Sequence, residues 1–308
     1  SADADTIYDV PLLMQKEQLD VVVLEKLGIT GYPEADLAQW TGFLQCYKEP
    51  KGEVDIGLVG KYVELKDAYK SIKEALDHAG AECELKVNIR WVHSERLTSK
   101  NVGKQLGGLS GILVAPGFGH RGIEGKIEAI RYARENRVPF LGICLGMQCA
   151  VIEFARNVLE FTGANSTEMD ANSPYPVIAM MEEQKRIENK GGTMRLGAYP
   201  CKLMDGSKAR AVYGKDRISE RHRHRYEFNN AYIDQFRDAG MLPVGMNPQT
   251  SLVEVVELQD HPWFIGVQYH PEYKSTVARP HPLFIGFVKA AIEQASVAGT
   301  ATAEKVGA

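Results

Sequence analysis

The chain has 308 residues, of which 44% are hydrophobic and 25% are charged; this composition supplies a sizeable core and excludes intrinsic disorder as the main state. Lys and Arg number 36 against 40 Asp and Glu, and the net charge of −4 argues against a broadly basic nucleic-acid-binding protein. No run approaches the roughly 18 apolar residues of a membrane span, and the first residues do not have the pattern of a signal peptide. The five cysteines lack metal-ligand spacing, so we expect reduced thiols in a cytoplasmic protein.

Within residues 1–50, the pattern of apolar residues predicts short helices at 10–14, 19–27 and 33–47. This segment has too few apolar residues to form a core of its own. We therefore expect it to pack on the following domain or on a part of the protein outside this chain. The polar break at 47–52, which contains Pro and Gly, is the candidate boundary.

From residue 53 onward, apolar runs typical of buried strands alternate with segments of helical periodicity. Strands are predicted at 54–59, 85–92, 111–114, 138–143, 176–180, 196–203, 252–257 and 264–269. Helices are predicted at 67–79, 123–136, 145–158 and 283–294. The alternation predicts an α/β fold, Rossmann- or flavodoxin-like, in which a mostly parallel sheet is covered by helices on both faces. Residues 295–308 are small and polar and predict a disordered tail.

The sharpest motif places Cys144 between Gly142 and Gly146, where a predicted strand meets a predicted helix. This G-x-C-x-G pattern is typical of a nucleophile elbow, with Cys in place of Ser. The tight turn lifts the sulfur clear of the sheet, and the helix N-terminus stabilises a thiolate. The backbone N–H of Leu145 would face an oxyanion formed beside the sulfur. A small buried cysteine in a glycine-rich turn is the alternative.

A second pattern, His270-Pro271-Glu272, follows the predicted strand 264–269. A cysteine nucleophile needs a base and a third group that orients the base. Two-residue spacing puts the side chains of His270 and Glu272 on one side of an extended backbone. Alone, the pattern is better interpreted as a solvated turn, but together with the Cys144 elbow it favours catalysis.

Two further segments carry chemistry only in combination with these motifs. The glycine-rich turn Ala115–Gly122 can bind an anion through its N–H groups, but it lacks the ending of an ATP-binding P-loop. The run Glu220–Asn229 interleaves Arg and His and is either a solvated face or an alternation that aims one Arg into a pocket, where it would bind a carboxylate. Its acidic flanks argue against nucleic-acid binding.

Taken together, four segments resemble the class I, triad-type glutamine amidotransferases, and most closely the glutaminase domains of the CTP synthase family. They are GICLGMQCAVIEFARNV (142–158), GANSTEMD (163–170), RHRHRYEFNN (221–230) and QYHPEY (268–273). The resemblance extends from about residue 6 to residue 287. It implies that residues 1–50 are the tail of the family's amidoligase domain with its linker, and that 51–294 form the glutaminase domain.

The resemblance also implies a role for each matching residue. Cys144 would attack the side-chain amide of L-glutamine, His270 would act as general base and then acid, and Glu272 would orient His270. Ammonia would leave, and water would hydrolyse the γ-glutamyl thioester to glutamate. The N–H groups of Gly117 and Leu145 match the family's oxyanion hole.

The remaining glutamine contacts follow from the same resemblance. Besides Gly117 and Leu145, they are Gln148, Glu168 toward the α-amino group, and Arg225 on the α-carboxylate. GTP is implied as an allosteric activator, and Arg121 lies in the loop associated with that response.

The family's cofactors and partners are implied in the same way. Ammonia would pass to the amidoligase domain, where ATP and Mg²⁺ are expected to serve the conversion of UTP into CTP. No cofactor or metal is expected in the glutaminase domain itself. The full-length enzyme is expected to be a homotetramer that binds neither nucleic acid nor membrane.

One residue departs from the family pattern. The usual loop reads Pro-Gly-Gly-Phe-Gly, whereas here Pro116 takes the first Gly position and cannot donate a hydrogen bond. Because Gly117 is retained, we expect activity to survive.

Three alternatives to this function stay open: a glutaminase of another synthetase, a γ-glutamyl hydrolase, and a module that is idle in isolation. The other cysteines, Cys46, Cys83, Cys149 and Cys201, are interpreted as structural.

Overall fold

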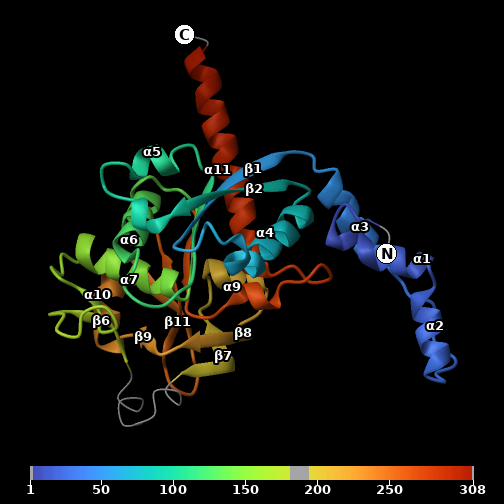
Figure 1. The fold of residues 1–308 in the computed structure, drawn as a ribbon. Coiled ribbons are helices and arrows are strands. Elements are labelled where there is room, and N and C mark those ends of the chain that lie inside the picture. The colour runs from blue at the N-terminus through green and yellow to red at the C-terminus, as the bar shows by residue number, and fades with distance from the viewer. Residues whose placement is uncertain (1–2, 181–193, 307–308) are drawn as a thin grey trace.

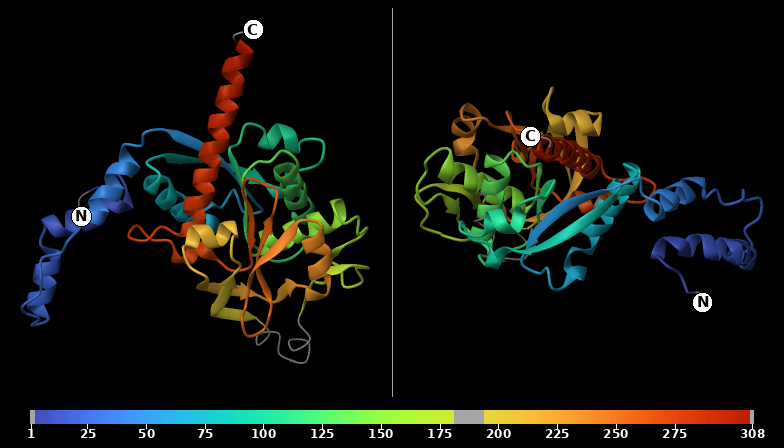
Figure 2. Two further views of the ribbon diagram at one scale, coloured as in Figure 1. Left: turned by 180° about the vertical axis from the view of Figure 1, so that it is seen from behind. Right: turned by 90° about the horizontal axis from the view of Figure 1, so that it is seen from above.

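A computed structural model describes residues 3–180 and 194–306 (Figure 1). A large sheet runs through the centre of the molecule, and the N-terminal helices and the C-terminal helix project from it (Figures 1 and 2). Its nine strands lie in the order β2-β1-β3-β4-β12-β11-β10-β7-β8. They are β1 (Glu53–Gly60), β2 (Lys86–His93), β3 (Gly111–Val114), β4 (Phe140–Ile143), β7 (Arg195–Leu203), β8 (Arg217–His224), β10 (Met241–Met246), β11 (Val253–Leu258) and β12 (Phe264–Val267).

The first five strands in this order are parallel, and the other four are antiparallel to their neighbours. Parallel neighbours need a crossover, which α4 (Lys70–Glu82) supplies between β1 and β2 and α6 (Ile123–Glu135) between β3 and β4. Short loops join β10 to β11 and β11 to β12, and these allow antiparallel pairing only. The predicted α/β fold is confirmed, whereas the prediction of a mostly parallel sheet holds for one half of it.

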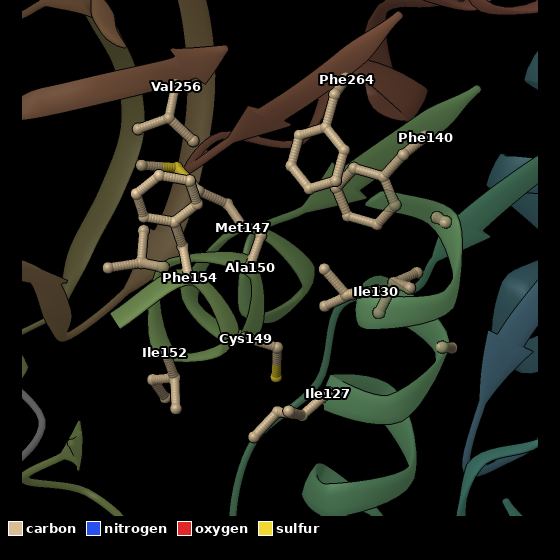
Figure 3. Close-up of a cluster of buried hydrophobic side chains, with 14 of the residues drawn as sticks. Ile127, Ile130, Phe140, Met147, Cys149, Ala150, Ile152, Phe154, Val256 and Phe264 are labelled. Carbon is tan, nitrogen blue, oxygen red and sulfur yellow. The ribbon is translucent and has the colours of Figure 1, made fainter. Parts of the chain in front are cut away.

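Both faces of the sheet are apolar, because successive residues of the buried strands point to opposite sides. Ile112 and Val114 pack in one core cluster with α6 and α7 (Leu145–Asn157). Leu113 packs in a second cluster with α4 and α11 (Pro282–Val306). Figure 3 shows part of the first cluster, in which Cys149 lies among hydrophobic side chains, so its interpretation as a core residue is confirmed.

A second sheet of three strands, in the order β5-β6-β9, lies beside α7. Its strands are β5 (Asn165–Ser166), β6 (Pro176–Met180) and β9 (Tyr226–Phe228). The shorter helices are α5 (Val102–Leu106), α9 (Lys208–Tyr213), α10 (Ile233–Asp238), η2 (Lys66–Tyr69), η3 (Ser94–Arg96), η5 (Asn230–Tyr232) and η6 (Pro271–Lys274). Strands β8, β9 and β10 are elements that the sequence patterns did not predict.

The N-terminal segment packs on the main domain through a small core of its own. It contains η1 (Ile7–Asp9), α1 (Val10–Lys16), α2 (Leu19–Lys26) and α3 (Ala38–Lys48). Tyr8, Phe43 and Leu44 contact Ala81 of α4 and Val277. The expectation that this segment packs on the following domain is therefore confirmed for η1 and α3. Helices α1 and α2, in contrast, bury no residue.

Two helix ends differ from the prediction. Helix α4 continues through Gly80 to Glu82, because Gly80 serves close packing: a Cβ atom there would lie 2.7 Å from the carbonyl oxygen of Leu85. The expected disordered tail at 295–308 is instead part of α11 as far as Val306. This stretch is rich in Ala, the residue with the highest helix propensity.

Candidate active site

Cys144 lies at the turn where β4 passes directly into α7. Its φ of 51° and ψ of −103° are strained for a residue with a side chain, as is common at functional turns. The turn needs glycine on both sides. A Cβ atom at Gly146 would lie 2.2 Å from the carbonyl oxygen of Val114, and one at Gly142 would lie 2.8 Å from the carbonyl carbon of Gly146. The backbone therefore has the predicted elbow geometry.

The side chain of Cys144 is buried next to the N-terminus of α7. Gln268 Nε2 donates a hydrogen bond to the sulfur over 3.6 Å. This donor and the positive end of the helix dipole both stabilise negative charge on the sulfur.

The end of β12 brings a histidine and a carboxylate to the same place. Val267 of β12 pairs with Ile143 of β4, and because the strands are parallel, the residues that follow them reach one edge of the sheet. The side chains of His270 and Glu272 are buried there. His270 Nδ1 lies 2.7 Å from Glu272 Oε1.

The surroundings of His270 favour its charged form. Burial alone lowers the pKa of His270, but its interactions with the neighbouring Cys144 and with Glu272, to which it is hydrogen-bonded, raise it to about 10. Because Glu272 occupies Nδ1, the other ring nitrogen is left for the sulfur of Cys144. The three side chains thus adjoin in the order sulfur, imidazole and carboxylate.

The glycine-rich loop reaches this edge from β3, whose Val114 pairs with Gly142. Gly117 lies against the start of α7: a Cβ atom there would lie 3.5 Å from Leu145 Cδ2. The structure therefore brings together the two predicted oxyanion residues, Gly117 and Leu145. Pro116 precedes Gly117 and has no N–H to offer.

Two buried lysines donate hydrogen bonds to the backbone of the glycine-rich loop. Lys126 Nζ donates a hydrogen bond of 2.5 Å to the carbonyl oxygen of Ala115, and Lys61 Nζ donates one to that of Phe118. A Cβ atom at Gly117 would be 3.6 Å from Lys61 Cε and 3.9 Å from Lys126 Nζ. The loop is therefore anchored at Ala115, before Gly117, and at Phe118, after it.

The other predicted glutamine-binding residues gather around Tyr226. Gln148 Nε2 donates a hydrogen bond of 2.9 Å to the Tyr226 carbonyl oxygen, and Glu168 accepts one of 2.9 Å from the N–H of Gly119. Burial and then the charge of Glu168 raise the pKa of Tyr226, whereas Arg225 lowers it. Within the described residues, the buried Nε of Arg225 has no hydrogen-bond partner. A carboxylate and an unpaired guanidinium N–H thus adjoin one turn.

Arg121 does not belong to this group of residues. Its guanidinium binds Glu95 at 2.7 Å and lies 5.2 Å from the centre of the Tyr62 ring. With 49% of its side chain exposed, Arg121 lies on the surface.

The Arg- and His-rich run forms β8 and the turn that follows it. Its alternation buries Glu220, His222 and His224 and leaves Arg223 exposed. Arg225 follows in the turn between β8 and β9. A strand with a polar buried face, rather than a solvated face, therefore explains the pattern.

Comparison with known proteins identifies the family to which the chain belongs. The family model "Glutamine amidotransferase class-I" matches residues 64–290, a range that contains every residue that the sequence analysis assigned to the site. The chain belongs to the class I glutamine amidotransferase family. This match confirms the resemblance to class I glutamine amidotransferases that the sequence motifs indicated.

Within the amidotransferases, the chain is similar to CTP synthases. The CTP synthase of Christiangramia forsetii is 63% identical over 293 residues, which are 95% of this chain and 54% of that protein. The CTP synthase of Cytophaga hutchinsonii is 65% identical over 291 residues, 94% of this chain and 54% of that protein. The chain thus spans about half the length of the curated relatives it matches. The solved glutaminase domain of Trypanosoma brucei CTPS with bound acivicin aligns with a TM-score of 0.74 at 37% identity, over 78% of this chain and 94% of that one.

Sequence reasoning missed two polar residues of this amidotransferase site. Gln268 accepts a hydrogen bond of 3.1 Å from Gln148 and donates one to Cys144. Its spacing of two residues from His270, which puts both on one side of an extended chain, could have indicated it. Lys126 stands on the apolar stripe of α6, a position at which a lysine signals a special role.

The site combines a thiol, an imidazole–carboxylate pair and backbone donors, which together support nucleophilic attack on a carbonyl carbon. Within residues 3–180 and 194–306, we find no group of three His, Cys, Asp or Glu side chains that could hold a metal ion. The same ranges contain no helix long and apolar enough to cross a membrane.

Proposed function

We propose that this chain is the glutaminase domain of a CTP synthase and that it hydrolyses L-glutamine to glutamate and ammonia at Cys144. The observation that supports this most directly is the strained elbow cysteine beside the buried His270–Glu272 pair. The similarity to CTP synthases, and to a glutaminase domain of that enzyme, supports the choice of substrate.

The reaction begins with His270 holding the proton of the Cys144 thiol, and the thiolate attacks the side-chain carbonyl carbon of glutamine. The carbonyl π electrons move onto oxygen, and the N–H groups of Gly117 and Leu145 stabilise the resulting oxyanion. Glu272 holds the imidazolium through Nδ1. His270 then gives its proton to the amide nitrogen, the C–N bond breaks, and ammonia leaves behind a γ-glutamyl thioester.

Deacylation uses the same groups. Water gives a proton to His270, its oxygen attacks the thioester carbon, and the C–S bond breaks to release glutamate and to restore the Cys144 thiolate beside protonated His270. Throughout, Arg225 binds the α-carboxylate of the substrate, Glu168 binds its α-ammonium group, and Gln148 supports their turn.

In the whole enzyme, the ammonia would pass to an amidoligase domain outside this chain. There ATP and Mg²⁺ would serve the amination of UTP to CTP. This part of the proposal draws on the similarity to CTP synthases, of which this chain spans about half. We further propose that the whole enzyme is cytoplasmic and assembles as a homotetramer.

GTP is proposed as the activator, with Arg121 as one of its contacts. Arg121→Ala in the full-length enzyme is expected to abolish the response to GTP and to leave glutamine hydrolysis without GTP unchanged. An unaltered GTP response would remove Arg121 from the proposal.

The test of the glutaminase function uses 6-diazo-5-oxo-norleucine, an electrophilic analogue of glutamine. We expect its mass on the peptide that contains Cys144, no labelling of Cys144→Ala, and normal labelling of the control Cys83→Ala. Glutamate release from glutamine should follow the same order. Equal labelling of all five thiols, or full activity of Cys144→Ala, would contradict the proposal. Activity that appears only with GTP and the amidoligase domain would identify a domain that is idle in isolation.

A further inference from the structure

Five buried polar side chains lie beneath the turn that carries Arg225, and the proposed reaction does not use them. They come from four strands and are each at most 7% exposed: Arg195 on β7, His222 and His224 on β8, Glu227 on β9 and Glu254 on β11. Burying charged groups is costly unless they are paired. A cluster of this size therefore needs an explanation.

Arg195 joins the two sheets of the molecule. Its Nη1 lies 3.1 Å from Glu227 Oε1, and its Nη2 lies 2.8 Å from Glu254 Oε1. Glu254 belongs to the nine-stranded sheet, whereas Glu227 belongs to the three-stranded one. One guanidinium thus ties the sheets together through charge-assisted hydrogen bonds, which are stronger than neutral ones.

The two sheets carry different parts of the site. Cys144 and His270 follow strands β4 and β12 of the large sheet. Glu168 follows β5 of the small sheet, and Arg225 leads directly into its strand β9. The tie through Arg195 therefore fixes the recognition groups relative to the reacting groups.

His224 holds the same turn through its backbone. His224 Nδ1 lies 3.2 Å from the carbonyl oxygen of Tyr226, the atom that also accepts a hydrogen bond from Gln148. His224 Nε2 lies 2.8 Å from His222 Nδ1. Burial lowers the pKa of both histidines, that of His222 to about 3. Neutral His224 therefore donates through Nδ1 and accepts from His222 at Nε2.

The cluster has two carboxylates for one guanidinium. Burial raises the pKa of Glu227 to about 8, although the charge of Arg195 opposes this, and burial raises that of Glu254 as well. Burial of both carboxylates thus favours a shared proton, which leaves one negative charge to balance that of Arg195. An apolar residue in place of Glu227 would leave Arg195 and Glu254 as a balanced pair, so the core can tolerate it.

We propose that this cluster positions the Arg225–Tyr226 turn and thereby determines how tightly the site binds the α-carboxylate of its amino-acid substrate. The proposal rests on the proposed glutaminase function. It makes Arg195, Glu227 and His224 positioning residues that act through Arg225.

The first variant, Glu227→Met, cuts the tie between the sheets. We expect the KM for glutamine and the half-saturating concentration of 6-diazo-5-oxo-norleucine to rise about tenfold, because small displacements of a positioning group weaken binding strongly. The alkylation rate of Cys144 by iodoacetamide, which has no α-carboxylate, should stay within twofold of wild type. Combined with Arg225→Met, Glu227→Met should add little further loss, because both changes remove the same interaction.

A pair of variants at His224 tests the backbone contact. His224→Leu removes the donor to Tyr226 and should weaken binding of the analogue. His224→Asn places an amide N–H near the same position and should restore most of it. Glu153→Met is the matched control, because Glu153 is fully buried and paired with Arg134 at 2.7 Å between two helices, away from the turn. It should lower stability without changing the KM for glutamine.

The outcomes separate the two proposals. If the wild-type protein is not labelled at Cys144, the glutaminase function itself fails. If the wild type is labelled and both Glu227→Met and His224→Leu bind the analogue as wild type does, the positioning role is refuted. A parallel fall in iodoacetamide reactivity would also refute it, because the cluster would then be general structural support.

Discussion

Lys126 Nζ lies 2.5 Å from the carbonyl oxygen of Ala115, and in the described part of the chain no carboxylate pairs with this fully buried ammonium group. Burial lowers the pKa of Lys126 to about 8, the charge of Lys61 adds to this, and the thiols of Cys149 and Cys144 oppose it. An unpaired buried cation is costly. Its position under the loop of Gly117 indicates that it maintains the loop conformation and favours negative charge nearby.

Lys126→Met should therefore lower the kcat of glutamine hydrolysis about tenfold and change the KM by less than twofold. The oxyanion exists only after attack, so a misplaced donor weakens the transition state more than the bound substrate. Steady-state assays of glutamate release measure both constants. Lys104→Met, on an exposed face of α5, is the control. An unchanged kcat would show that the loop holds its shape without Lys126.

Glycine at position 146 is required by the approach of β3. The Cβ atom of Gly146→Ala would lie 2.2 Å from the backbone oxygen of Val114, so the elbow must shift, at a cost of roughly 2 to 4 kcal/mol in the free energy of unfolding. Gly103→Ala is the matched control, because its nearest neighbour would be 3.9 Å away and the residue lies within α5. It should gain about 0.5 to 1 kcal/mol from helix propensity. Urea denaturation gives both values, and equal stabilities would contradict the close approach.

The raised pKa of His270 predicts a dependence of stability on pH. The folded state binds this proton more tightly than the unfolded state, because the pKa is about 10 when folded against 6.5 for the free side chain. The contribution is therefore fully present below pH 6.5 and is lost as the pH rises toward 10, by at most about 1.4 kcal/mol per pH unit. The difference in unfolding free energy between wild type and His270→Gln should decrease over that range. The other titratable groups are common to both proteins, so their contributions cancel in this difference. Parallel curves from pH 6 to pH 10 would refute the assignment.

The contact of the N-terminal segment with α4 depends on Tyr8. Its hydroxyl donates to Glu74 and lies 3.3 Å from His78 Nε2, and His78 Nδ1 lies 3.0 Å from Ser275 Oγ. Tyr8→Phe should lower the free energy of unfolding by about 1 to 2 kcal/mol, and Tyr8→Ala by about 3 kcal/mol or more, because it also empties a buried site. Calorimetry or urea denaturation measures both. Tyr32→Phe is the control, since its hydroxyl has no hydrogen bond to a described residue; equal losses at Tyr8 and Tyr32 would contradict the packing.

Much of the parallel half of the sheet could be predicted from sequence, because β3, β4 and β12 are short apolar runs, each followed by a motif. Cys144, His270 and Gly117 follow three such strands, so predicting the strands also predicted that these residues meet. The pairing of β4 with β3 and β12 turns that expectation into contact.

The antiparallel half was predicted only in part: the strands at 196–203 and 252–257 were expected, whereas β8 and β10 were not. In β8, three of the four buried positions carry Glu220, His222 and His224, so most of its inner face has the polarity of a surface. Two of these residues have partners that lie far away in the sequence: His281 Nε2 lies 3.2 Å from Glu220 Oε1. Glu254 Oε2 lies 3.6 Å from His222 Nδ1. Local periodicity describes the polarity of one strand and contains no information on the partners that satisfy it.

The elbow at Cys144 sets activity against stability at a single position. Backbone angles of 51° and −103° cost a residue with a Cβ atom on the order of 1 to 3 kcal/mol, and glycine avoids that cost. The most stable version of this fold would therefore carry glycine at 144 and lack the proposed nucleophile. Mutational drift and selection for stability both lead away from the thiol, so under the proposed function its retention depends on the demand for catalysis alone.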